Sequence, residues 1–281
     1  MKIKDFVIPA KISEAYEFAH SLGQSAYYIA GGTSAYFVQA NVEKIAIDIS
    51  KLPLFGITAK RDSFRIGSLT TISDIMKKEE DGFVLNRAAK RFVNQQIRNI
   101  STIGGNIARV FYWSDFPVVL KTLDGRIKIT GFDSKTLKIS DVFHNSTTHK
   151  EAIGNAIIEY IEIPRLLKNM GFSYSKETRI SSGFSSATIA SFIELKDNKI
   201  KDVRITVGSV FIFPMRLFEL ENSLKGEPAD LSIINKINFN LLDKYKFIPR
   251  DGMNLEYCKH LVKTRIKDVL VEAFKEALGE R

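Results

Sequence analysis

Along the first 165 residues, apolar positions alternate between the spacing of helices and the spacing of strands. Repeats of three to four residues, typical of one helix face, predict helices at residues 12–22, 71–77, 83–92 and 115–123. Compact apolar or alternating runs predict strands at residues 6–9, 26–30, 45–49, 64–67, 127–129 and 156–163. The opening segment is therefore expected to form a small βαβ-like unit.

The pattern changes after Pro164, so residues 164–171 are the expected domain boundary. Alternating runs predict antiparallel strands at residues 172–174, 187–195 and 199–207, with Asp197-Asn198 as a hairpin turn. Helical periodicity follows at residues 215–224, 231–242 and 255–278. The second domain is therefore expected to be a three-stranded antiparallel sheet with helices on one face.

The composition is that of a globular protein. Hydrophobic residues make up 44% and charged residues 26% of the chain, which excludes a wholly disordered or fibrous protein. With Cys258 as the only cysteine, this chain alone can form neither an internal disulfide nor a thiolate-bound iron–sulfur cluster. A reducing, cytoplasmic compartment is the expected location. The first residues do not resemble a secretory signal, and no apolar run of about 18 residues predicts a membrane span.

The chain is basic, with a formal net charge of +9. The excess is spread over both halves, without a basic tail or a Lys/Arg run with interleaved aromatic residues, so a nucleic-acid partner is not expected. A phosphate-bearing cofactor or an acidic protein partner accounts for the charge equally well. The four histidines fall in no shared site and no metal-ligand or Ser–His–Asp pattern is present, so neither a metal site nor a catalytic side chain is expected.

Two glycine pairs are the main candidates for binding chemistry. Ala30-Gly31-Gly32-Thr33-Ser34 follows a predicted strand, and Thr102-Ile103-Gly104-Gly105-Asn106 comes later in the same half of the chain. Glycine allows positive φ and close approach to a ligand, and consecutive N–H groups then form a concave site for a phosphate. Two such turns suit the two phosphates of a dinucleotide. Neither has the spacing of the Rossmann fingerprint or the P-loop, and a purely structural role for both remains the alternative.

These motifs resemble the two flavin-binding motifs of the FAD subunit of molybdenum hydroxylases, a group that includes the medium subunit of carbon monoxide dehydrogenase and the FAD domain of xanthine dehydrogenase. The resemblance covers nearly the whole chain. It extends to Asp48-Ile49-Ser50, Ile66-Gly67-Ser68-Leu69-Thr70, Gln96-Ile97-Arg98-Asn99, Ser114-Asp115-Phe116-Pro117, Tyr174-Ser175-Lys176 with Arg179, and Pro214-Met215-Arg216.

The resemblance implies an α+β fold in two domains. The first is a two-part FAD-binding domain of the PCMH/vanillyl-alcohol-oxidase-like type at residues 1–165, with α/β subdomains at about 1–55 and 56–165. The second is a smaller domain of the CO dehydrogenase flavoprotein type at residues 170–281, which corresponds to the predicted three-stranded sheet and its helices.

The resemblance also implies a non-covalent FAD site that both motifs help to build. The implied cofactor-binding residues are Ile29, Ala30, Gly31, Gly32, Thr33, Ser34, Ala35, Phe92, Thr102, Ile103, Gly104, Gly105, Asn106, Asp115, Ile158 and Lys176. The motifs are implied to hold the pyrophosphate from opposite sides. Asp115 is implied on the ribose or adenine side, Ile158 at the adenine end, and Lys176 near the flavin.

Taken alone, several of these residues have ordinary structural interpretations. Asp115 caps a helix, Phe92 fills a core, and Lys176 is a solvated charge on a strand. The chain also departs from the family pattern, because the bulky run Arg109-Val110-Phe111-Tyr112-Trp113 stands where small residues are usual. Trp113 either covers the cofactor or fills the core. The surroundings of the flavin, and with them the electron acceptor, therefore stay open.

The function that the resemblance implies is that of the FAD-binding electron-transfer subunit of a heteromeric molybdenum hydroxylase. A small iron–sulfur subunit would deliver electrons, a large subunit would hold molybdopterin, and an external acceptor such as NAD, quinone or oxygen would receive the electrons. The single cysteine agrees with clusters carried only by partners. The alternatives are a stand-alone FAD-dependent NAD(P)H reductase or diaphorase, and a basic binding protein without enzymatic activity.

Overall fold

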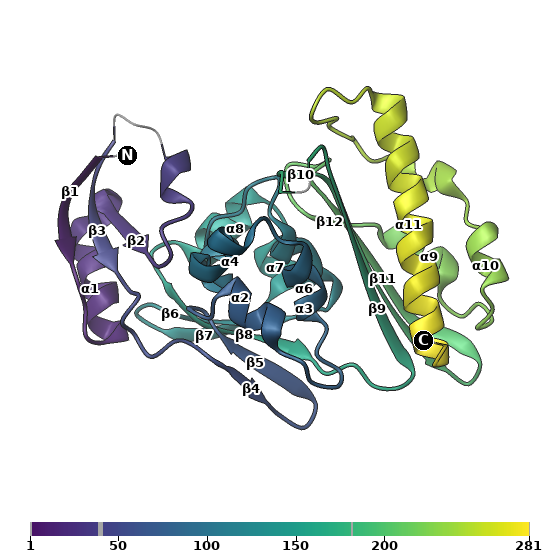
Figure 1. The fold of residues 1–281 in the computed structure, drawn as a ribbon, viewed down its shortest axis with the longest axis horizontal. Helices are drawn as coiled ribbons and strands as arrows, with labels where there is room; N and C mark the ends of the chain where they lie inside the picture. The colour runs from purple at the N-terminus through teal and green to yellow at the C-terminus, as the bar shows by residue number, and fades with distance from the viewer. Residues whose placement is uncertain (1, 39–41, 181, 281) are drawn as a thin grey trace.

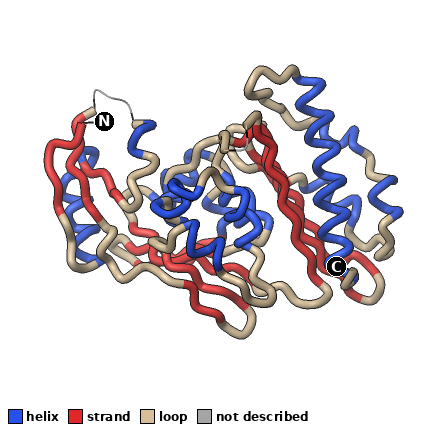
Figure 2. Tube along the Cα trace, in the orientation of Figure 1, coloured by secondary structure: helices blue, strands red, loops and turns tan. Residues whose placement is uncertain are grey.

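The structure is a computed structural model that describes residues 2–38, 42–180 and 182–280. Three parts, each built on its own β-sheet, follow one another along the long axis of the molecule (Figure 1). The sheets have three, five and four strands, and helices cluster between the second and third sheets and beyond the third (Figure 2). The expected α+β fold class is confirmed.

The first part is a small α/β unit, as expected. Its elements are β1 (Lys2–Val7), α1 (Ile12–Leu22), the 3-10 turn η1 (Gly23–Ser25), β2 (Ala26–Ile29), the 3-10 turn η2 (Ala35–Phe37) and β3 (Glu43–Asp48). The strands are parallel in the order β1-β3-β2. Ala15 and Ala19 on the apolar face of α1 are fully buried in the core with Ile47 of β3, which holds the helix against the sheet. β2 ends directly before the first glycine motif.

The second part carries an antiparallel sheet in the order β4-β5-β8-β6-β7. Its elements are β4 (Ile57–Ala59), β5 (Ser63–Gly67), α2 (Ile72–Lys77), α3 (Leu85–Arg91), α4 (Gln95–Ile100), α5 (Ile103–Ala108), α6 (Asp115–Thr122), β6 (Arg126–Thr130), β7 (Ser134–Lys138), α7 (Ile139–Val142), α8 (Ser146–Ile153) and β8 (Ile157–Pro164). The sequence pattern did not predict the short helices α4, α5, α7 and α8. Each is eight residues or shorter, which gives apolar periodicity little length to show.

The third part has four strands instead of the expected three. Its elements are β9 (Met170–Thr178), β10 (Ser185–Lys196), β11 (Lys199–Gly208), β12 (Met215–Arg216), α9 (Phe218–Leu224), α10 (Ser232–Asn235), the 3-10 turn η3 (Phe239–Leu242) and α11 (Leu255–Leu278). The helix predicted at 215–224 starts only at Phe218, because the two residues of β12 pair with β11. The helix predicted at 231–242 is wrong: two short pieces replace it. α11 has the predicted bounds.

Helix α6 joins the second and third parts. All eight of its residues are buried, because the third sheet covers the side that the second part leaves open. The opposite face of the third sheet packs on α11, and side chains alternate between these faces along β9. Phe172 and Tyr174 belong to the core of the second part, so Lys176, two residues further on, faces the same way.

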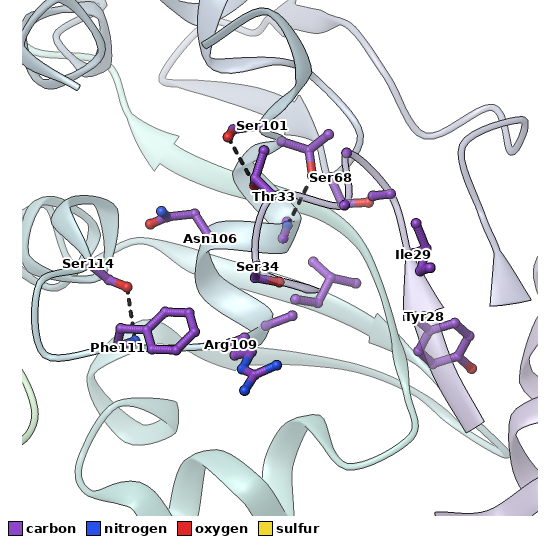
Figure 3. A pocket seen from close by; sticks show the side chains of 18 of the residues that line it. Tyr28, Ile29, Thr33, Ser34, Ser68, Ser101, Asn106, Arg109, Phe111 and Ser114 are labelled. Carbon is purple, nitrogen blue, oxygen red and sulfur yellow. Dashed lines mark hydrogen bonds between the residues drawn. The ribbon is translucent and has the colours of Figure 1, made fainter. Parts of the chain in front are cut away.

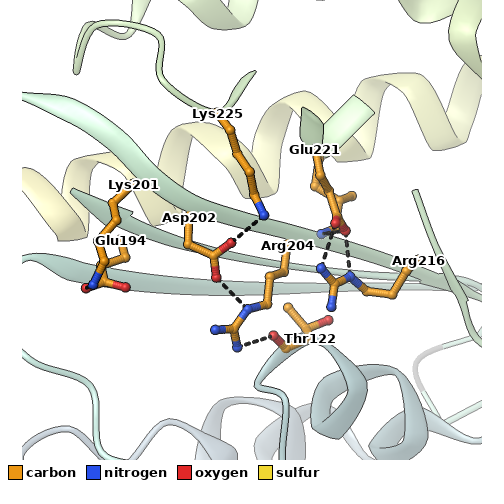
Figure 4. Close-up of polar contacts among 9 residues, drawn as sticks. Thr122, Glu194, Lys201, Asp202, Arg204, Arg216, Glu221 and Lys225 are labelled. Carbon is orange, nitrogen blue, oxygen red and sulfur yellow. Dashed lines mark hydrogen bonds and ion pairs between the residues drawn. The ribbon is translucent and has the colours of Figure 1, made fainter. Parts of the chain in front are cut away.

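A group of ion pairs fixes the third sheet next to α6 (Figure 4). The guanidinium of Arg216 donates to both carboxylate oxygens of Glu221 at 2.6 Å, and both residues are buried. Arg204 donates to Asp202 at 2.7 Å and to the carbonyl oxygen of Thr122, the last residue of α6, at 3.4 Å.

The described strands of the three sheets fall within residues 2–48, 57–164 and 170–216, so we retain 1–55, 56–165 and 170–281 as the proposed division of the chain.

Candidate functional site

A cleft of about 610 Å³ lies where the three parts meet (Figure 3). Its volume falls in the range of about 300–1,000 Å³ that is usual for small-molecule sites. Residues of both glycine motifs line it, together with residues of α6, β8 and β9. Every site residue expected from the sequence lines the cleft except two. Ile103 is wholly buried in the core of the second part, and Ala35 lies at the start of η2 outside the lining.

The first glycine motif lines the cleft and contains backbone donors that no described residue uses. Gly32 has a φ of +69°, which turns the chain sharply after β2 and disfavours any other residue there. Gly31 packs so closely on the second part that a Cβ would lie 1.7 Å from the carbonyl oxygen of Ile100. Within the described ranges, the N–H groups of residues 31–34 donate to no protein acceptor. Four consecutive uncommitted donors in a concave loop are suited to an anion.

The second glycine motif is the start of helix α5, so the turn expected there is wrong. Thr102 is the N-cap and its hydroxyl accepts the N–H of Gly105 at 3.1 Å. The N–H groups of Ile103 and Gly104 donate to backbone carbonyls of the loop before α2 at 3.1 and 2.8 Å. Glycine is needed at 104 for packing, because a Cβ would lie 2.6 Å from that of Ser68. This motif therefore offers side chains to a ligand, while its first amides are already committed.

Two polar atoms in the lining lack hydrogen-bond partners. Ser68 Oγ and Asn106 Oδ1 are buried and have no partner among the described residues. Buried polar groups are normally paired, so a polar ligand in the cleft is the simplest way to satisfy them. Figure 3 shows Ser68, Asn106 and Thr33 around the middle of the cleft, with Tyr28 at one side and Phe111 at the other. Unpaired polar groups between these two walls fit a long, polar molecule such as a dinucleotide.

A buried ion pair lies at one end of the cleft. Lys176 Nζ is 2.8 Å from Asp115 Oδ2, and the phenol of Tyr174 donates to Asp115 Oδ1 at 2.9 Å. Burial, reinforced by the negative charge of Asp115, raises the pKa of Tyr174 well above its ordinary value, so the phenol stays a donor. The ammonium of Lys176 also lies 5.8 Å from the centroid of the Phe92 ring.

This pair bears on three expectations. Asp115 and Lys176 touch, so the sites implied for them, on the ribose or adenine side and near the flavin, lie next to each other in the cleft. Asp115 is the first residue of α6, after the N-cap Ser114, and its carboxylate is bound by side chains of β9, so the helix-cap interpretation is wrong. Lys176 is 7% exposed and is not a solvated charge. Phe92 belongs to the core and also lines the cleft.

The other end of the cleft is mainly apolar. Tyr28, Ile157 and Ile158 contribute to its wall. The phenol of Tyr28 donates to the carbonyl oxygen of Asn155 at 2.9 Å, which ties the first part to the second. Burial raises the pKa of Tyr28, helped by nearby Tyr16, so this link persists across the physiological range.

In the part of the chain that the structure describes, no three His, Cys, Asp or Glu residues are grouped to hold a metal ion. The described helices include none that is long and apolar enough to cross a membrane.

Two family models together match most of the sequence. The family described as "FAD binding domain in molybdopterin dehydrogenase" matches residues 1–166, and "CO dehydrogenase flavoprotein C-terminal domain" matches residues 172–273. The chain belongs to the FAD-binding domain family of the molybdopterin dehydrogenases.

Relatives of similar length support this membership. The glyceraldehyde dehydrogenase medium chain of Sulfolobus acidocaldarius is 27% identical, with 82% of each chain covered. The xanthine dehydrogenase FAD-binding subunit of Escherichia coli O157:H7 is 26% identical, covering 83% of this chain and 82% of the relative. A solved structure of carbon monoxide dehydrogenase from Hydrogenophaga pseudoflava has the same fold, with a TM-score of 0.89 at 22% identity over 98% of each chain.

One wall of the cleft in this family member is a cluster of aromatic rings, here called the aromatic panel: Phe37, Phe111, Trp113 and Phe184. Phe111 and Trp113 stack with centroids 4.7 Å apart, and Phe184 lies 4.6 Å from Trp113. Phe37 lies within 5.8 Å of the other three rings. The bulky run at residues 109–113, which departs from the family pattern, indicated Trp113 as a residue of the site. Nothing in the sequence pattern indicated Phe37 or Phe184. Trp113 is half-buried and lines the cleft, so it both packs and faces the site.

Proposed function

We propose that this chain is the FAD-binding electron-transfer subunit of a heteromeric molybdenum hydroxylase. One observation carries the proposal: a single cleft joins the uncommitted N–H groups of residues 31–34 to the side chains of the second family motif. The chain belongs to an FAD-binding family, and the cleft has the size and the polar middle that FAD requires.

FAD, when bound, supplies a ring that accepts and releases electrons, so no side chain has to act as an acid or a base. The work of this chain is binding and orientation. The N–H groups of residues 31–34 would hold the diphosphate, and Asn106 would receive a hydrogen bond at Oδ1. Lys176 and Asp115 would face the flavin end, while Ile158 would wall the adenine end.

Partners supply the rest of the electron path. Relatives are named as medium chains or FAD-binding subunits of dehydrogenases, which supports a subunit role over a stand-alone reductase. We infer a small iron–sulfur subunit and a large molybdopterin subunit, because Cys258 is a single, buried thiol that cannot ligate a cluster by itself. The external acceptor is NAD, a quinone or oxygen. A chain with one cysteine also suits a reducing, cytoplasmic compartment.

An absorption spectrum of the purified chain before and after addition of FAD tests the proposal. We expect the flavin bands to shift and to stay with the protein through gel filtration. Co-purification with two further subunits would support the complex, whereas NADH-dependent dye reduction by the chain alone would favour the reductase. A chain that retains no FAD would overturn the proposal.

A further inference from the structure

The cleft contains one charge that no neighbour compensates. Among its described lining residues, Arg109, Asp115 and Lys176 are charged. Asp115 and Lys176 neutralise each other in the buried pair. Within the described ranges, no carboxylate forms an ion pair with Arg109, which makes its guanidinium the source of net positive charge in the cleft.

The contacts of Arg109 are few and long. Its Nη1 donates to the phenol of Tyr27 at 3.4 Å, and its Nη2 donates to the carbonyl oxygen of Phe37 at 3.4 Å. Both distances exceed the usual range for N–H···O bonds, which ends near ~3.2 Å. The guanidinium also lies 5.1 Å from the ring centroid of Phe111. With five N–H donors in a planar fork, it retains donors for a ligand.

Arg109 is close to the row of free backbone donors. The phenol of Tyr27 that it contacts lies 3.4 Å from the hydroxyl of Ser34, the last residue of the first motif. Figure 3 shows Arg109 and Ser34 next to each other on the cleft wall. The N–H groups of residues 103–105 in the second motif already donate to protein oxygens, so they offer no donors to a ligand held by residues 31–34. Arg109, at the C-terminal end of α5, is instead the positively charged donor that lies next to residues 31–34.

From this arrangement we propose that Arg109 binds the diphosphate of the dinucleotide and neutralises part of its charge. The inference rests on the proposed function and names a binding residue for it. A planar guanidinium pairs with phosphate oxygens through two parallel hydrogen bonds, which the long contacts to Tyr27 and Phe37 leave it free to form. The alternative is a structural role, in which Arg109 only braces η2 against the loop after α5.

The test compares FAD binding by the full-length chain with that of three variants: Arg109→Gln, Arg109→Lys and Arg126→Gln. Arg126 is exposed on β6 and does not line the cleft, so its variant has the same change in net charge and serves as the matched control. The dissociation constant for FAD is measured by flavin fluorescence at several salt concentrations.

We expect Arg109→Gln to raise the dissociation constant about tenfold to a hundredfold, the usual range for losing a hydrogen bond to a charged group. Its plot of log Kd against log salt should be less steep than that of the unchanged chain, because one phosphate contact is lost. Arg109→Lys should keep the salt dependence and lose less affinity, and Arg126→Gln should match the unchanged chain.

An unaltered affinity in Arg109→Gln would overturn the inference. A raised constant with an unaltered salt dependence would also overturn it, since that is the signature of a structural brace. If the unchanged chain binds no FAD, the proposed function fails first, which separates the two failures.

Discussion

The ammonium of Lys176 lies 2.8 Å from the carboxylate of Asp115, although β9 and α6 belong to different parts of the molecule. Both side chains are almost completely buried, and both line the cleft. The pair therefore fixes the third part against the second at the place where we propose the flavin ring. Removal of one partner would leave the other charge buried and uncompensated.

Lys176 and Asp115 should be strongly coupled in stability. We expect Asp115→Ala to lower the free energy of unfolding by about 3–5 kcal/mol, the usual cost of breaking a buried pair. The double variant Asp115→Ala/Lys176→Met should regain much of this loss, since no uncompensated charge remains. Chemical denaturation of the single and double variants measures the coupling. Effects that simply add would show that the pair is not coupled.

The same pair should tune the flavin in opposite directions. Loss of a nearby negative charge stabilises added electrons, and loss of a positive charge does the reverse. We therefore expect Asp115→Asn to raise the reduction potential of bound FAD and Lys176→Gln to lower it. Equilibration with reference dyes measures both shifts. Shifts of the same sign would place the ring away from this pair.

The two glycines of the first motif should respond differently to substitution. Gly31→Ala places a Cβ against the carbonyl of Ile100, so we expect a large loss of stability. Gly32→Ala meets only Ile29 Cγ2, at 4.0 Å, but keeps a positive φ, which costs about 1–2 kcal/mol. Gly226, at a φ of +84° with nothing close, is the matched control in the third part. Thermal unfolding should show similar losses for Gly32→Ala and Gly226→Ala, whereas only Gly32→Ala should weaken FAD binding. Equal FAD affinity in both variants would count against the proposed diphosphate site.

Trp113 should report on the cofactor, because it is the only tryptophan of the chain and lies in the aromatic panel. Aromatic rings favour stacked or edge contacts with a flat partner. We expect FAD binding to quench the tryptophan emission strongly. Phe111→Leu, which removes the stacking partner but keeps the reporter, should give weaker quenching at saturation. Unquenched emission in a chain that holds FAD would place the ring far from the panel.

The sequence predicted long and local features well. α11 has the predicted bounds because 24 residues of periodic pattern lie between an Asn254 cap and Gly279 in the left-handed region. The glycines at 104 and 105 were misassigned for a physical reason. Glycine disfavours helices, so the pair predicted a turn, whereas Gly104 is needed for the close packing of α5 against Ser68, which is distant in sequence.

The candidate site was predictable where short motifs carry it and unpredictable where tertiary contacts do. Residues of both glycine motifs line the cleft, as expected, but only the first motif has backbone N–H groups that no described residue uses. The contact between Asp115 and Lys176 joins residues 61 positions apart, so no local pattern could show it. The aromatic panel likewise assembles from η2 and two separate loops, and Phe184 joins it only through the fold.

Lys121, near the end of α6, is buried and donates to the carbonyl oxygens of Phe143 at 2.9 Å and Pro214 at 2.8 Å. Burial lowers its pKa from 10.5 to about 8, with a smaller contribution from Arg216 that Glu221 opposes. Between these values the unfolded chain holds a proton that the folded chain has released, so stability rises with pH through this window. The cost of burying the charge is fully present below pH 8.

We therefore expect the stability of the unchanged chain, relative to Lys121→Met, to increase by up to about 3 kcal/mol between pH 7 and pH 10.5. Urea denaturation of both proteins across this range measures the difference, and other titrating groups cancel in the comparison. Parallel curves for Lys121→Met would mean that the ammonium keeps its ordinary pKa, because only a pKa that differs between the folded and unfolded chains makes stability depend on pH.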